Sequence, residues 1–289
     1  MKRIATIGFF DGVHRGHQYL FRCLGDEANK RHLAPLIVTF RDHPRQVLQM
    51  GYQPQLLSSV DERRQLLEQY APIEFFDFQQ IRPLTAGQFM RLLKERHEVD
   101  ALLVGYDHRF GSDRIQDIEQ LQAIGRREGL DVVQAGQFEL ADNPSVHISS
   151  TEIRNAIAEG EIELANRLLG YPYMLTGTVV HGRGIGRTLG FPTANIRLDE
   201  ARKLLPPPGV YAVRADFGAA HEQPAILNIG TNPTIGENPI TIELHIPGLD
   251  LDLYGRSLSV HIVRFLRKEQ RFESLEELRA QIEEDVKRL

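Results

Sequence analysis

Two histidines at helical spacing are the first residues in the chain that could do chemistry. Within GFFDGVHRGH, His14 and His17 follow the apolar run Ile4–Phe10, which we expect to be a buried strand, and they begin a helical stretch. On a helix, both imidazoles can then point at one anion. Glycines at a strand end admit a ligand to the backbone, and a helix N-terminus offers N–H groups to phosphate. The segment predicts a nucleotide phosphate site that also includes Gly8, Phe9 and Gly16.

A glycine-rich basic loop in the second half is the next candidate for phosphate binding. It carries Gly182, Gly184, Gly186 and Arg187, and it follows an expected strand at Thr176–Val180. Successive backbone N–H groups in such a loop can wrap a phosphate. The glycine spacing matches neither a P-loop nor a dinucleotide-binding fingerprint. The loop alone therefore indicates a phosphate contact without identifying the ligand.

Oxygen-bearing side chains follow that loop. Thr193 and Asn195 lie two residues apart in PTAN, so in an extended segment they face the same way. Their hydroxyl and amide oxygens suit Mg²⁺, which takes a few protein oxygens together with substrate phosphates. Glu243 lies in ITIELHI, where we expect it to share a polar strand face with Thr241 and His245. From the residues alone, the pair also fits an ordinary turn, and the glutamate also fits a solvated strand face.

The composition narrows the class of protein. The chain has 289 residues, 42% of them hydrophobic and 25% charged, which favours two globular domains. A net charge of −5 and a pI of about 6.1 argue against nucleic acid as a partner. The single cysteine, Cys23, excludes an internal disulfide and suits a reducing compartment. Without a signal-peptide core or an apolar run of ~18–20 residues, we expect a soluble cytoplasmic protein that binds no membrane.

The first half alternates strand and helix patterns. We expect strands at Leu36–Phe40, Ala101–Val104 and Asp131–Ala135, and helices at Asp61–Tyr70 and Ala86–His97. This alternation predicts a parallel sheet with helices on both faces. Residues 151–169 are expected to form a helix broken near Gly160, with Gly170 as its C-cap. We place the domain boundary there, giving domains of residues 1–170 and 171–289.

The second half changes to period-two patterns separated by turn clusters. Apolar residues alternate in segments around Val213, Leu244 and Val260, with PPPG at 206–209 and GTNP at 230–233 between them. Several short alternating strands predict a small antiparallel barrel or sandwich. The chain closes with an expected helix from Leu275 to Lys287, where Ser274 and Glu277 have capping-box spacing.

These motifs resemble a known family. GFFDGVHRGH resembles the His-x-Gly-His signature of nucleotidylyltransferases, in the version found in bacterial bifunctional riboflavin kinase/FAD synthetases. TFRDHP at 39–44, VGYDHRFG at 104–111, ISSTEIR at 148–154 and GRTLGFPTAN at 186–195 agree with that family. Two residues depart from its pattern, since Phe9 stands where many members have Asn, and His108 stands where Phe is usual. The resemblance covers nearly the whole chain.

The resemblance implies a Rossmann-like nucleotidylyltransferase domain followed by a small antiparallel β-barrel domain with a C-terminal helix. The first domain would adenylylate FMN to FAD with ATP and release pyrophosphate, using His14, His17 and Arg154 on the phosphates. Ser150 and Thr151 would add nucleotide contacts, and His43, Asp107 and Arg109 would contact flavin or phosphate. The barrel would phosphorylate riboflavin to FMN and release ADP, with Mg²⁺ held by Thr193 and Asn195 and with Glu243 as the base.

Three other functions each fit some features of the sequence less well. A different nucleotidylyltransferase, of the pantetheine-phosphate or glycerol-phosphate type, fits the first domain but not the PTAN segment. A flavin carrier with inactive sites is disfavoured because the chain keeps both histidines, Arg154 and Glu243. A nucleic-acid module is opposed by the acidic charge and by the lack of a KMSKS-like lysine loop. The sequence leaves the oligomeric state open.

Overall fold

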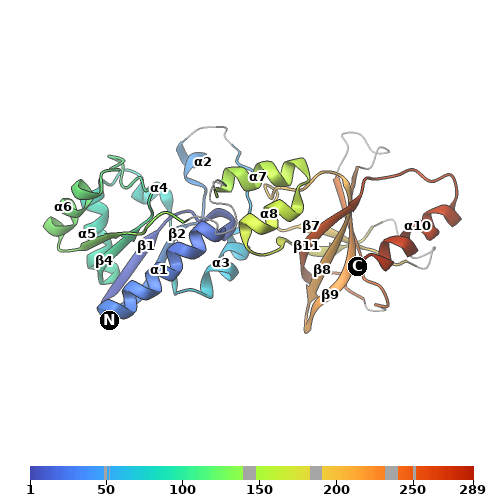
Figure 1. The fold of residues 1–289 in the computed structure, drawn as a ribbon, viewed down its shortest axis with the longest axis horizontal. Helices are drawn as coiled ribbons and strands as arrows, with labels where there is room; N and C mark the ends of the chain where they lie inside the picture. The colour runs from blue at the N-terminus through green and yellow to red at the C-terminus, as the bar shows by residue number, and fades with distance from the viewer. Residues whose placement is uncertain (49–50, 52, 139–147, 183–190, 232–239, 250–251) are drawn as a thin grey trace. The chain divides into compact units, whose positions relative to one another are not determined.

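The protein is described here by a computed structural model, which covers residues 1–48, 51, 53–138, 148–182, 191–231, 240–249 and 252–289 (Figure 1). The chain forms two compact units. The first consists of Met1–Pro54 and Val60–Ser149, and the second of Gln55–Ser59 and Ser150–Leu289.

A five-stranded parallel sheet forms the centre of the first unit. Its strand order is β3-β2-β1-β4-β5, and every neighbouring pair is parallel (Figure 1). The strands are β1 Arg3–Ile7, β2 Ala34–Phe40, β3 Ile73–Phe76, β4 Val99–Val104 and β5 Asp131–Gln134. The predicted parallel sheet is confirmed. The expected first strand was too long, because Phe10 adopts a left-handed conformation with φ of 54° and the chain has already left the sheet.

Helices cover both faces of this sheet, as expected. The longer ones are α1 Arg15–Arg31, α3 Val60–Glu68, α5 Ala86–His97 and α6 Ile118–Glu128, and the short ones are η1 Asp11–Val13, α2 Pro44–Leu48 and α4 Phe78–Ile81. One core joins α1 and α3 to strand residues such as Ile4 and Ile37. A second core joins α5 and α6 to Ala5 and Val38, the residues that follow Ile4 and Ile37 in the strands. Because successive strand residues point to opposite faces, the apolar runs supply both cores.

The strand order fixes where ligands meet this sheet. The chain passes from β1 to β2 on one side, and β4 then continues on the other side of β1. In open α/β sheets, ligands bind outside the carboxyl ends of the strands at such a switch point. Three predicted segments follow those ends: GFFDGVHRGH after β1, DHP after β2 and YDHR after β4. The topology therefore collects them at one edge.

A closed antiparallel barrel forms the centre of the second unit. Its order is β10-β7-β6-β11-β8-β9, so of the two predicted alternatives the barrel is confirmed. The strands are β6 Tyr173–Val180, β7 Ala194–Leu198, β8 Gly209–Phe217, β9 Ala220–Thr231, β10 Ile240–His245 and β11 Ser257–Arg267. Closure pairs the edges that an open sheet would expose.

Two helices before the barrel belong to the second unit. They are α7 Ser150–Glu159 and α8 Ile162–Leu169; Gly160 at the break has a φ of 81° and the C-cap Gly170 one of 86°. The amide of Asn166 joins α8 to the barrel. Its Nδ2 donates to the carbonyl oxygens of Ile262 and Val263 at 2.9 and 3.1 Å, and its Oδ1 accepts from the N–H of Tyr173 at 2.8 Å. The contacts thus divide the chain before α7, while the predicted functional boundary after Gly170 stays a prediction.

The C-terminal helix α10 spans Leu275–Lys287, the expected range. The Ser274 hydroxyl accepts from the N–H of Glu277 at 3.1 Å, as the capping-box spacing predicts. The reciprocal bond differs, because the Glu277 carboxylate accepts from the N–H of Glu273 at 3.2 Å rather than from Ser274. The buried Asp285 forms a salt bridge with Arg267 of β11 at 2.8 Å, which links α10 to the barrel.

Candidate active sites

The loop after β1 is held in a strained conformation. Phe10 and the β-branched Val13 both have positive φ, 54° and 39°, in a region that such side chains rarely adopt. The Phe10 ring is buried against Phe21, with 4.9 Å between ring centroids. A Cβ on Gly8 would lie 2.6 Å from the Phe10 ring, so this glycine makes room for the ring as well as for a ligand. Strain of this kind is kept where packing over-determines the backbone, often at functional sites.

The two histidines of this loop stack on each other. His14 is the N-cap residue of α1 and His17 lies in its first turn, with ring centroids 3.6 Å apart and planes 19° from parallel. A Cβ on Gly16 would lie 3.3 Å from the His14 ring, so Gly16 lets that imidazole lie close to the backbone. The edge of Phe10 contacts His17 at 5.2 Å. The two imidazoles thus lie together at the start of the helix, and their joint contact with an anion stays a prediction.

The histidine pair is set up to hydrogen-bond rather than to carry two charges. Burial, and then the neighbouring His14, hold the pKa of His17 well below its ordinary value of 6.5. His17 is therefore neutral near pH 7 and can donate from one nitrogen. Its Nδ1 is buried and has no hydrogen-bond partner within the described residues. An arriving phosphate would supply both an acceptor and a negative charge that favours protonation.

The other predicted residues of the first unit follow β2 and β4. His43 lies after β2, and its ring meets the Phe9 ring edge-on at 4.7 Å. Asp107 and Arg109 lie after β4 and are exposed. Between them, His108 donates from Nδ1 to the Gly105 carbonyl at 3.1 Å, because a carbonyl oxygen can only accept. All these residues lie at the carboxyl edge of the sheet.

Three predicted residues belong to the second compact unit. Ser150, Thr151 and Arg154 belong to α7 in the second compact unit. The Arg154 guanidinium donates from Nε to the Gln55 carbonyl of the same unit at 2.8 Å. The part of these residues in adenylylation stays a prediction.

The barrel brings its three predicted oxygen-bearing residues together. In the pairing of β10 with β7, Glu243 stands directly opposite Asn195. The Thr193 hydroxyl donates to Oε2 of Glu243 at 3.4 Å. Gly182 follows β6, and a Cβ on it would overlap the Asn195 amide. Strand register therefore gathers residues that lie 50 positions apart in the sequence. Gly184, Gly186 and Arg187 lie outside the described residues.

A histidine that the sequence did not single out supports the PTAN turn. His245 is buried and donates from Nδ1 to the Pro192 carbonyl at 2.9 Å, while its ring meets Phe191 edge-on at 5.4 Å. We expected His245 on the polar strand face. The difference arises at the end of β10, where both His245 and its neighbour Leu244 are buried. The only advance signal was its position two residues after Glu243.

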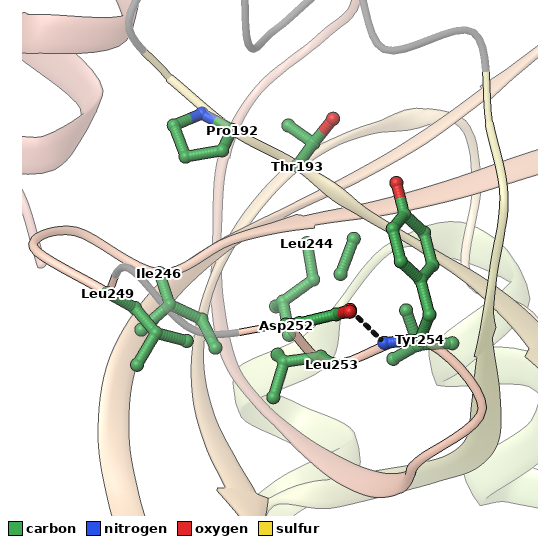
Figure 2. A pocket seen from close by; sticks show the side chains of 10 residues that line it. Pro192, Thr193, Leu244, Ile246, Leu249, Asp252, Leu253 and Tyr254 are labelled. Atoms are coloured by element: carbon green, nitrogen blue, oxygen red, sulfur yellow. Dashed lines mark hydrogen bonds between the residues drawn. The ribbon is translucent and has the colours of Figure 1, made fainter.

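An open pocket with a cavity volume of about 70 Å³ lies beside Thr193. It is lined by Val179, Pro192, Thr193, Ala194, Leu244, Ile246, Leu249, Asp252, Leu253 and Tyr254 (Figure 2). The Asp252 carboxylate accepts from the N–H of Tyr254 at 3.0 Å, as the dashed line in Figure 2 shows. The Tyr254 ring stacks on His181 at 3.9 Å. The lining of the pocket thus combines apolar side chains with Thr193, the residue that contacts Glu243.

The donor atoms at this point fit a hard cation. Thr193, Asn195 and Glu243 offer hydroxyl, amide and carboxylate oxygens, the ligand types that Mg²⁺ takes together with substrate phosphates. In the described part of the chain, no three His, Cys, Asp or Glu side chains gather as a site for a metal held by protein alone. A magnesium ion here would therefore share its coordination with a substrate.

None of the helices in the described ranges is long and apolar enough to cross a lipid bilayer.

Comparisons with known proteins match both units. A family model described as FAD synthetase matches residues 1–152, and one described as riboflavin kinase matches residues 169–289. The chain is 39% identical over 287 residues to the bifunctional riboflavin kinase/FMN adenylyltransferase of Escherichia coli K12, covering 98% of this chain and 90% of that protein. The enzyme of the same description from Pseudomonas fluorescens is 37% identical, again over 98% and 90%.

A solved structure has a different description. A protein from Streptococcus pneumoniae described as a macrolide-efflux protein superposes with a TM-score of 0.88 at 31% identity, over 99% of this chain and 93% of that one. Its description belongs to that protein, while the fold agrees over both units. From the two family models and the full-length relatives, the chain belongs to the bifunctional riboflavin kinase/FMN adenylyltransferase family.

Proposed function

We propose that the two units of this chain divide the family's two reactions between them. The barrel, within residues 171–289, phosphorylates riboflavin to FMN, and the parallel-sheet domain, within residues 1–170, adenylylates FMN to FAD. The observation that carries the proposal is the meeting of Thr193, Asn195 and Glu243 in the barrel, because it supplies a base beside oxygen ligands. ATP serves both reactions, and the proposal places the enzyme in the cytoplasm, where ATP is made.

In the barrel, the proposed chemistry is phosphoryl transfer to a hydroxyl group. Glu243 accepts the proton of the ribityl 5′-hydroxyl while that oxygen bonds to the γ-phosphorus of ATP, and the bond to the β-phosphate oxygen breaks to release ADP. The hydrogen bond from Thr193 orients the carboxylate. Thr193 and Asn195 would hold the magnesium ion, which neutralises phosphate charge when bound. Gly182 lets the preceding backbone approach Asn195 closely.

At the sheet edge, the proposed chemistry needs placement rather than a base. The FMN phosphate is already a nucleophile; its oxygen bonds to the α-phosphorus of ATP while the bond to the pyrophosphate oxygen breaks. Catalysis then depends on orientation and on donors that stabilise phosphate charge. His14 and His17 donate to the phosphates, and His43, Asp107 and Arg109 contact FMN. The N-terminus of α1 adds its N–H groups and the positive end of its dipole.

Product chromatography tests the proposal directly. The purified full-length protein is mixed with riboflavin, ATP and magnesium, and flavins are separated over time. We expect FMN to form first and FAD second, and FMN supplied alone with ATP to become FAD. A chain that binds these flavins without converting either would contradict the proposal.

A further inference from the structure

Arg63 of α3 is a fully buried cation that the mechanism above does not use. Its side chain is 0% exposed. Its Nη2 donates to the carbonyl oxygens of Phe40 and Arg41 at 2.6 and 3.3 Å. Its guanidinium carbon lies 4.1 Å from the centroid of the Phe9 ring. Nε and Nη1 are buried, and no acceptor meets them within the described residues.

All of these contacts are made to residues at or just after the carboxyl ends of β1 and β2. Phe9 lies after β1, Phe40 ends β2 and Arg41 begins the segment that carries His43. The Phe9 ring also meets the His43 ring edge-on, with 4.7 Å between the ring centroids, and the backbone carbonyl of Phe9 accepts from the Thr39 hydroxyl at 3.2 Å. Phe9 is thus in contact with the guanidinium and with the imidazole, and the three groups form a chain from the interior of the unit to its carboxyl edge.

The cost of this arrangement indicates that stability is not its purpose. Burial lowers the pKa of Arg63 to about 10, although Asp11 and Asp42 favour the charged form, so the side chain is a cation at pH 7. A buried charge whose donors are incompletely paired is unfavourable, and apolar residues often replace such groups without loss of stability. What the guanidinium does provide is direction, because Nη2 donates to two carbonyls while the planar group lies over an aromatic ring.

We propose that Arg63 is a positioning residue of the adenylyl-transfer site, which holds Phe9 against His43 and so places the His43 imidazole for contact with FMN. The inference rests on the proposed contact between His43 and FMN. Without the guanidinium, the Phe9 ring loses its partner on the interior side and the segment after β2 loses its hydrogen bonds. FMN binding then weakens, while the histidine pair that meets ATP keeps its own packing against Phe10.

The test compares Arg63→Met with Arg64→Met in the full-length protein. Arg64 is the next residue of α3, and its guanidinium lies 4.6 Å from the Phe75 ring, so its variant removes the same kind of contact away from His43. We expect Arg63→Met to raise the KM for FMN on the order of tenfold, the loss that follows when one charge-assisted hydrogen bond is misplaced. In Arg63→Met, the KM for ATP and the rate of riboflavin phosphorylation should stay within about twofold of wild type. In Arg64→Met, every kinetic constant of both reactions should stay within the same range.

A double-variant cycle separates positioning from an independent role. If Arg63 acts through His43, Arg63→Met adds nothing to the KM for FMN in a His43→Ala protein. Additive increases in the KM for FMN in the double variant would overturn the inference. So would an unchanged KM for FMN in folded Arg63→Met, or an equal rise in the KM for FMN and the KM for ATP. An unchanged KM in His43→Ala alone would instead contradict the proposed FMN contact. Should Arg63→Met fail to fold, Arg63→Lys decides: it keeps the charge but loses the planar guanidinium over the Phe9 ring, and a wild-type KM for FMN in it would overturn the inference.

Discussion

The two candidate sites of this molecule are positioned by different kinds of structure. In the barrel, the ladder between β7 and β10 puts Asn195 opposite Glu243, so the site follows from strand register. At the edge of the parallel sheet, the histidine pair follows from a strained loop, with Phe10 and Val13 at positive φ and two rings in stacking contact. Hydrogen-bonded register tolerates substitution of one side chain, because the backbone keeps the others in place. Loop placement depends on the side chains themselves.

This contrast predicts how locally each site fails. A substitution of Thr193, Asn195 or Glu243 in the barrel should reduce riboflavin phosphorylation and leave the fold and FAD formation unchanged. A substitution in the loop after β1 should change chemistry together with local packing, because His17 contacts both His14 and Phe10.

Glu243→Gln should give the largest loss. The amide keeps the shape and can still accept from Thr193, but it cannot take the proton of the ribityl hydroxyl. We expect the kcat for FMN formation to fall by about 10²–10⁴, the usual contribution of a general base, with the conversion of FMN to FAD unchanged. Steady-state assays of both reactions on one preparation measure this. Glu276→Gln, an exposed carboxylate of α10, serves as the control; normal FMN formation in Glu243→Gln would remove Glu243 from the mechanism.

His17→Ala should give the next largest loss, in the other reaction. It removes a phosphate donor and also the rings' stacking contact, so we expect FAD formation to fall by about 10²-fold or more. Riboflavin phosphorylation should be retained. His32→Asn is the matched control, because His32 is an exposed residue at the other end of α1 and Asn accepts its left-handed conformation. Loss of both activities in His17→Ala would show that the reactions are not divided as proposed.

His245 tests whether backbone contacts place the barrel residues, since its ring hydrogen-bonds to the backbone carbonyl of Pro192. His245→Leu leaves the Pro192 carbonyl without its donor, and a hydrogen bond of this kind contributes about 0.5–1.5 kcal/mol. We expect riboflavin phosphorylation to fall about tenfold through a displaced PTAN turn. His245→Asn places an amide N–H near the position of Nδ1 and should restore most of the activity. Equal activity in the Leu and Asn variants would show that the hydrogen bond to Pro192 has no role in placing Thr193.

Much of this architecture could be predicted from local patterns. The apolar runs predicted the parallel sheet, period-two segments predicted a barrel or a sandwich, and the capping-box spacing predicted the start of α10. What failed was non-local. The apolar run after β1 continues to Phe10, and nothing in it signals that the backbone turns left-handed there. The strand β3 was missed because IEFF is short and only half-buried.

The candidate sites show the same limit. Thr193, Asn195 and Glu243 could be named from the sequence, but their meeting depends on a register between β7 and β10 that no local pattern specifies. Arg63 was missed because DERRQLL has the composition of a solvated helix, and charged residues are rarely buried. Its partners are two carbonyls and an aromatic ring more than 20 residues away in the chain. Backbone acceptors carry no sequence signal at all.

The smallest expected effect concerns stability and pH, and it tests whether the loop site is coupled to packing. The pKa of His17 is lowered in the folded protein, chiefly by burial, while in the unfolded chain it returns toward 6.5. Above that pH neither state binds the proton. Below it the unfolded chain binds it first, so the stability that depends on neutral His17 is lost as the pH falls from 6.5 toward the folded-state pKa.

Calorimetry of the full-length protein between pH 7.5 and 5.5 measures this dependence through the transition of the first unit. A change of about 1 kcal/mol moves the Tm of a unit of this size by roughly 2–4 °C. We expect His17→Gln to have a shallower decline on acidification than wild type, and His32→Asn to follow wild type. Parallel curves for His17→Gln and wild type would mean that the imidazole is not kept neutral by its surroundings. The histidine pair would then be as independent of local packing as the barrel residues are, and the contrast between loop and register would lose its basis.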